Sequence, residues 1–136
     1  MLTKVLVIDD DPDMTDLLSH LLKTRGFNVI SSNNGEEGVQ KTRNDSPDVI
    51  ILDLMMNGMD GWQVCAAVRK FSSIPILILT ALDNPGTVVS ALDAGADDFL
   101  TKPVSSGLLV SRLNTLTRRM LTKEAGMFIP APPISI

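Results

Sequence analysis

The chain of 136 residues has no tyrosine and only one each of tryptophan, histidine and cysteine. With Cys65 as its single cysteine it cannot form an internal disulfide, and the surrounding VCAAV predicts a buried, unreactive thiol. It contains no apolar run of eighteen residues and no basic segment followed by an apolar one near its start. We therefore expect neither a membrane-spanning nor a secreted protein, but a cytoplasmic one.

Basic residues are fewer than acidic ones: the chain has 12 Lys and Arg and 16 Asp and Glu, for a formal net charge of -4. This balance argues against direct nucleic-acid binding by the domain. Apolar residues are abundant instead, at 44% of the chain, which is enough for one domain with a real core. We expect that domain at residues 1–122, followed by a proline-rich apolar tail or linker stub at 123–136.

Apolar runs of strand length alternate with helical patterns along the chain. The expected strands are 4–8, 27–31, a fully apolar one within 46–54 directly before Asp53, 74–80 and a short one within 94–103. The helices that follow them are 14–25, 35–44, 61–71, 87–94 and 105–121. Five such units predict an α/β fold with a parallel sheet covered on both faces. We expect a flavodoxin-like open sandwich with strand order 2-1-3-4-5, because a closed barrel would need about 250 residues.

Chemically reactive side chains stand where the predicted strands end. They are Asp9, Asp10, Asp53, Thr80 and Lys102. Because parallel strands end at the same edge of a sheet, we expect these side chains to converge, with the acids beside the point where strand order reverses. Three carboxylates without a nearby histidine or cysteine favour Mg²⁺ or Mn²⁺ and disfavour zinc.

Phosphoryl chemistry fits this set of side chains. The Lys102 ammonium and the Thr80 hydroxyl can contact phosphate oxygens. A carboxylate placed beside them can attack a phosphorus centre, and Asp53, alone at the end of its strand, is the expected nucleophile. The neighbouring acids Asp11 and Asp13 flank a proline and are better explained as residues of a helix start.

Four segments resemble the signature sequences of receiver domains of two-component response regulators. They are VLVIDDDPDM (5–14), VIILDLMMNGMDGW (49–62), PILILTA (75–81) and AGADDFLTKP (94–103). The resemblance covers roughly residues 3 to 121 and implies a signalling switch rather than a metabolic enzyme. A histidine kinase or phosphotransfer protein would phosphorylate Asp53, and the surface of the fourth helix, fifth strand and fifth helix would change and contact an output domain or partner protein.

The resemblance also implies a role for each residue of the site. Asp53 would be the phospho-acceptor and a metal ligand, Asp10 a direct Mg²⁺ ligand, and Asp9 a ligand acting largely through water. The backbone carbonyl of Met55 would complete the protein's share of the metal shell.

A second group of residues would carry the switch itself. Thr80 resembles the hydroxyl that turns towards the phosphoryl group, and Phe99 the aromatic side chain that swings inward with it. Lys102 resembles the phosphate-binding lysine, and the bond between Lys102 and Pro103 resembles the cis peptide of the family.

Three further positions near the site bear on its loops and on hydrolysis. Asn57 stands where proline usually follows the second methionine, and we expect it to alter loop stiffness rather than chemistry. Met55 and Leu82, two places after the acceptor and the switch hydroxyl, cannot position a water molecule by hydrogen bonding. The sequence therefore predicts slow autodephosphorylation.

The residues that pair receivers in one subclass are only partly present. Asp97, Asp98 and Arg112 match, but Val88 and Leu108 stand where an arginine and a glutamate are usual. A phosphorylation-dependent homodimer is therefore either absent or held by a more apolar contact.

Two other function classes compete with the phosphorylated switch. A receiver-like adaptor regulated by protein contact alone would be favoured by an altered acid pair or a missing lysine, and this sequence has neither. A phosphatase with an aspartate nucleophile generally has a second acid two residues further on, where this chain has Met55, and the chain has no substrate-sized cap.

Overall fold

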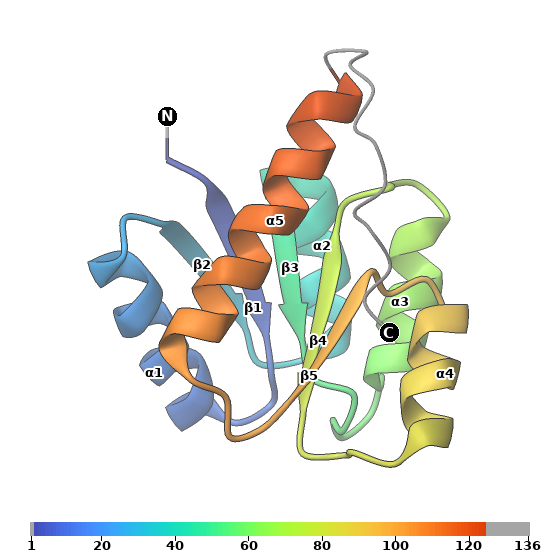
Figure 1. Cartoon of the computed structure of the whole chain (residues 1–136). Helices are drawn as coiled ribbons and strands as arrows, with labels where there is room; N and C mark the ends of the chain where they lie inside the picture. The colour runs from blue at the N-terminus through green and yellow to red at the C-terminus, as the bar shows by residue number, and fades with distance from the viewer. Residues whose placement is uncertain (1, 125–136) are drawn as a thin grey trace, which may run out of the picture.

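In the computed structural model, the described part of the chain comprises residues 2–124, with side chains described as far as Arg118. Five strands alternate with five helices in this part (Figure 1). The strands are β1 (Lys4–Ile8), β2 (Asn28–Ser32), β3 (Val49–Leu52), β4 (Ile76–Thr80) and β5 (Asp98–Thr101). The helices are α1 (Pro12–Thr24), α2 (Gly35–Asp45), α3 (Gly61–Arg69), α4 (Pro85–Asp93) and α5 (Ser106–Glu124).

The strands form one parallel sheet in the order β2-β1-β3-β4-β5. Helices α1 and α5 pack on one face of the sheet, and α2, α3 and α4 cover the other (Figure 1). The prediction of a flavodoxin-like open sandwich with strand order 2-1-3-4-5 is therefore confirmed.

Each central strand sends successive side chains into two separate cores. On β1, Leu6 and Ile8 join the core beneath α2, α3 and α4, while Val5 and Val7 join the core beneath α1 and α5. All four are fully buried. A strand that is covered on both faces reads as a continuous apolar run, which is why these strands could be found from sequence.

The third strand lies where it was predicted, fully apolar and directly before Asp53. Within the segment 46–54 it spans Val49–Leu52. Ser46 caps α2 in the left-handed conformation with φ of 46°, and Asp48 bonds to the Lys4 backbone, so the chain is still turning there. Several other elements differ from the prediction by small shifts at their ends, as at α4, which begins at Pro85 rather than at 87.

Two composition-based expectations can be compared with the described residues. Cys65 is fully buried, and burial raises the pKa of its thiol to about 11, which agrees with an unreactive cysteine. No helix among residues 2–124 is both long and apolar enough to cross a membrane. The expected tail lies almost entirely outside the described residues, so the boundary at residue 122 stays an expectation.

Candidate functional site

The carboxyl edge of the sheet brings together the side chains predicted from the strand ends. Asp9, Asp53 and Thr80 are buried, with exposed fractions of 3%, 7% and 0%. Asp10 and Lys102 are half-buried beside them. The peptide bond between Lys102 and Pro103 is cis, the geometry that the resemblance implies.

Lys102 is the charge centre of this cluster. Its ammonium nitrogen lies 2.7 Å from Oδ2 of Asp9 and 3.0 Å from Oδ2 of Asp53. Burial is the largest single influence and lowers the pKa of Lys102, but the hydrogen bonds and negative charges of the two carboxylates together raise the pKa above its usual value. At Asp9 burial is the larger influence, and it raises the pKa of the carboxyl despite the contact with Lys102.

The second oxygen of each buried carboxylate is held by the chain that follows it. Oδ1 of Asp9 accepts a hydrogen bond from the Asp11 backbone N–H at 3.0 Å, and Oδ1 of Asp53 accepts one from the Met55 N–H at 3.1 Å. These local bonds fix both carboxylates with Oδ2 turned to the lysine. Asp9 and Asp53 therefore have defined side-chain orientations before any ligand binds.

Local sequence explains why the loops around the site adopt these paths. Asp11 caps α1 and Pro12 begins it, as predicted, which turns the chain sharply after β1. On the neighbouring loop, a Cβ atom at Gly61 would lie 2.5 Å from the Asp53 carbonyl oxygen. Only glycine allows α3 to start so close to the end of β3.

Thr80 has an unsatisfied hydrogen-bond donor. Within the described part of the chain, its Oγ1 is the one buried side-chain nitrogen or oxygen that makes no hydrogen bond. A buried hydroxyl without a partner is unfavourable and calls for an explanation. An acceptor brought in with a ligand would satisfy it.

The switch aromatic expected from the resemblance lies near this hydroxyl along the sheet. Phe99 pairs with Ile78 in the register of β5 on β4, two residues before Thr80. It is partly buried and packs against the core beneath α2, α3 and α4. Ala81, which follows Thr80, is exposed.

The acidic cluster suits a divalent cation in chemistry, although it is not a preformed cage. Among the residues described, no group of three or more His, Cys, Asp or Glu is arranged to hold a metal ion. Two of the three carboxylates are turned to Lys102 instead. The donors that remain are all oxygens, on a half-open edge where water can complete the shell, which is how proteins usually bind Mg²⁺.

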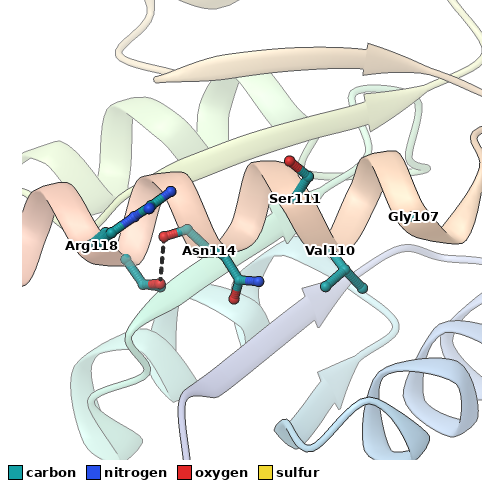
Figure 2. A pocket seen from close by; sticks show the side chains of 6 residues that line it. Gly107, Val110, Ser111, Asn114 and Arg118 are labelled. Carbon is teal, nitrogen blue, oxygen red and sulfur yellow. Dashed lines mark hydrogen bonds between the residues drawn. The ribbon is translucent and has the colours of Figure 1, made fainter.

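A groove on α5 is a separate feature. Figure 2 shows it lined by Gly107, Val110, Ser111, Asn114, Thr117 and Arg118. The Thr117 hydroxyl is turned back to helix carbonyls, at 2.9 Å from Leu113 and 3.3 Å from Asn114. The groove has no acidic lining residue among those described, and nothing in it suggests phosphoryl chemistry.

The charges expected at a dimer contact are used within the chain. Arg112 donates to both oxygens of Asp98 at 2.9 Å, and Asp97 pairs with Arg69 at 2.8 Å. Leu108 is 42% exposed, and Val88 is half-buried. A dimer formed through this surface would therefore be held by apolar side chains more than by ion pairs between the two copies.

Two contacts escaped prediction from sequence. The Asn57 backbone N–H donates to Oδ2 of Asp10 at 3.0 Å. Arg69 donates to the backbone carbonyls of Ser72, Ile74 and Gly95 as well as to Asp97. Asparagine in place of the usual proline was a usable signal for the first contact, because proline has no N–H to donate.

Comparison with known proteins places these features in a family context. The sequence matches a family described as the response regulator receiver domain over residues 5–114. The receiver domain of the Francisella response regulator 1452 has 34% identity and a TM-score of 0.82, with coverage of 87% of this chain and 98% of that one.

Two further solved structures are similar along nearly their whole length. The chemotaxis protein CheY4 of Vibrio cholerae has 32% identity and a TM-score of 0.79, with coverage of 85% of this chain and 99% of that one. The N-terminal receiver domain of Klebsiella pneumoniae RstA, described as BeF3-activated, has 28% identity and a TM-score of 0.82, with coverage of 85% and 99%.

Proposed function

The chain belongs to the response regulator receiver domain family, whose members act as signalling switches in two-component systems, and on this premise we propose that it is a phospho-accepting switch modified on Asp53. Receiver domains of this kind interact with histidine kinases and output domains. The phosphoryl donor proposed here is a sensor histidine kinase or a phosphotransfer protein.

One observation carries the proposal. The Lys102 ammonium lies 3.0 Å from Oδ2 of Asp53, and the Lys102 backbone N–H donates to the carbonyl of Thr80, whose buried hydroxyl has no partner. A phosphoryl group attached to Asp53 would meet both a fixed positive charge and a free hydrogen-bond donor. Donors that are oriented before the reaction stabilise the charge that develops on phosphoryl oxygens.

The transfer needs few groups from the protein. An oxygen of the Asp53 carboxylate forms a bond to phosphorus while the bond from phosphorus to the histidine nitrogen of the donor breaks, and the leaving nitrogen keeps that electron pair. Lys102 offsets the charge of the equatorial oxygens. Asp9, Asp10, Asp53 and the Met55 carbonyl are the groups that would hold Mg²⁺, which when bound neutralises negative charge at the reacting oxygens.

The switching step follows from the added charge. A phosphoryl group brings about 1.5 to 2 negative charges and strong acceptor oxygens, so the Thr80 hydroxyl gains the partner that it lacks. Its movement frees space that Phe99 can fill. The proposed result is a changed surface on α4, β5 and α5, read by an output domain or partner protein.

The test is intact mass after incubation with acetyl phosphate and Mg²⁺, for the wild type beside Asp53→Ala. We expect the wild type alone to gain one phosphoryl group, and we expect a chelator to abolish the gain. No gain in a folded wild-type protein would overturn the proposal. It would favour the second candidate, an adaptor regulated by protein contact alone, for which the exposed apolar residues Val89, Leu92 and Leu108 provide a surface.

A further inference from the structure

Asp10 is held differently from the other two acids of the site. Among the described residues, its carboxylate makes no ion pair with Lys102. It accepts one hydrogen bond, from the Asn57 backbone N–H at 3.0 Å. The two residues are 47 positions apart, on the loops that follow β1 and β3. This bond joins two loops at the edge where the acids converge.

We propose that the Asn57 backbone N–H is a positioning group for Asp10, which raises the affinity of the site for a divalent cation. The inference rests on the proposed function, in which Asp10 is a direct metal ligand. The N–H engages Oδ2 and leaves Oδ1 free to face the cation. A carboxylate can accept at both oxygens, so the two interactions are compatible.

The physical reason is orientation. A half-exposed aspartate can rotate its carboxylate freely, and binding a cation then costs the entropy of fixing that rotation. A hydrogen bond from a rigid backbone group fixes it beforehand. Groups that orient metal ligands in this way typically change metal affinity by about 10- to 100-fold when they are removed.

The hydrogen bond to Asp10 depends on which residue stands at position 57. Where proline occupies this position, as the family pattern usually has it, no N–H exists and the bond cannot form. The Asn57 side chain is exposed, and the recorded bond comes from its backbone alone. Replacing asparagine by alanine therefore keeps the donor, whereas replacing it by proline removes the donor.

The experiment compares the Mg²⁺ dissociation constant of the wild type, Asn57→Ala and Asn57→Pro by isothermal titration calorimetry. We expect the wild type and Asn57→Ala to bind equally and Asn57→Pro to bind about tenfold more weakly. Proline also stiffens the loop, which would act in the opposite direction where it fits the backbone. Binding by Asn57→Pro as tight as that of the wild type would overturn the proposal.

A second measurement keeps the proposal testable if Asn57→Pro does not fold. The hydrogen-exchange rate of the Asn57 amide is measured by NMR in the wild type, without metal and with saturating Mg²⁺. We expect the amide to be protected in both conditions and to lose protection in Asp10→Ala. Loss of protection when Mg²⁺ binds would overturn the proposal, because the N–H would then compete with the metal.

Failure of this inference can be told apart from failure of the proposed function. A wild-type protein that gains a phosphoryl group, but whose Mg²⁺ affinity is unchanged in Asn57→Pro, overturns the inference alone. A wild-type protein that neither binds Mg²⁺ nor gains a phosphoryl group overturns both.

Discussion

Lys102 and Arg69 each bring a positive charge to carboxylates at the sheet, but at opposite edges and with opposite results. Arg69 lies at the amino edge and donates to three backbone carbonyls and to Asp97. Asp97 in turn accepts from the Ile76 backbone N–H at 2.8 Å, so this cluster satisfies its hydrogen bonds locally. We call the contacts of Arg69 the arginine staple.

The site at the carboxyl edge is less complete. One ammonium faces two buried carboxylates, and the neighbouring Thr80 hydroxyl has no partner. Complete hydrogen bonding stabilises the folded chain. An excess of negative charge and a buried hydroxyl without a partner are unfavourable for folding, but a bound ligand can pair with both. Under the proposed function, the arginine staple serves stability and the site around Lys102 serves phosphoryl chemistry, and the substitutions below would test this comparison.

The largest expected effect is on the chemistry of the site. Lys102→Ala should slow phosphorylation by acetyl phosphate about 100-fold, the usual loss when one oriented donor to a developing charge is removed. Intact mass at successive times measures the rate. Lys41→Ala is the matched control, because Lys41 bonds to Glu37 and the Ser31 carbonyl away from the site, and should leave the rate unchanged. A Lys102→Ala rate close to wild type would contradict the assignment.

The next effect should fall on stability instead. Arg69→Ala leaves Asp97 unpaired and several carbonyls without their donor, and should lower the free energy of unfolding by about 2 kcal/mol, after allowing for partial exposure. Urea unfolding measures it. Arg43→Ala, which removes a guanidinium 4.4 Å from the Phe71 ring centroid, should cost about 0.5 kcal/mol. Phosphorylation of Arg69→Ala should proceed normally while the protein is folded, and a strong loss would erase the distinction between the two clusters.

The third effect concerns the lifetime of the phosphoryl group. Met55, which is 57% exposed, and Leu82, which is half-exposed, have apolar side chains, so neither can position an attacking water by a hydrogen bond. Met55→Asn and Leu82→Glu should each shorten the lifetime on the order of tenfold by orienting that water. Loss of the added mass after removal of the donor measures it, and lifetimes equal to that of the wild type would sink the prediction.

The smallest expected effect is an increase in stability, whereas most substitutions lower stability. Thr80→Val replaces a buried hydroxyl that has no partner by a methyl group, and should raise the free energy of unfolding by about 1 kcal/mol. Thr42→Val is the control, since the Thr42 hydroxyl is also buried but donates to the Gly38 carbonyl at 2.8 Å. We expect Thr42→Val to bring no such gain. Thermal unfolding of both variants measures this, and a destabilised Thr80→Val would mean that its hydroxyl has a partner in solution.

The sheet was predictable because its strands are covered on both faces. Such strands appear as uninterrupted apolar runs, of which KVLVI is the clearest. The end of the third strand before Asp53 was predicted, but the residue at which it starts within 46–54 was not. Its true start follows the cap at Ser46, which depends on backbone conformation.

The positions of the reactive side chains were predictable for a related reason. Residues that follow strands in the same direction must meet at one edge, so Asp9, Asp53 and Lys102 could be grouped before any distance was known. The bond from Asn57 to Asp10 and the arginine staple could not be predicted in this way. Both contacts involve backbone atoms, which strand ends do not locate, although asparagine in place of the usual proline indicates that an N–H is available at Asn57.

What the sequence by itself determined is the class of fold and the set of reactive groups, because apolar periodicity follows from residue types and parallel strands end at one edge of a sheet. The tertiary structure decided how those groups are paired. It set Lys102 against Asp9 and Asp53, left the Thr80 hydroxyl without a partner, and joined Asp98 to Arg112 within the chain. Pairing depends on distances of a few ångströms between segments far apart in sequence, and only the packed chain sets those distances.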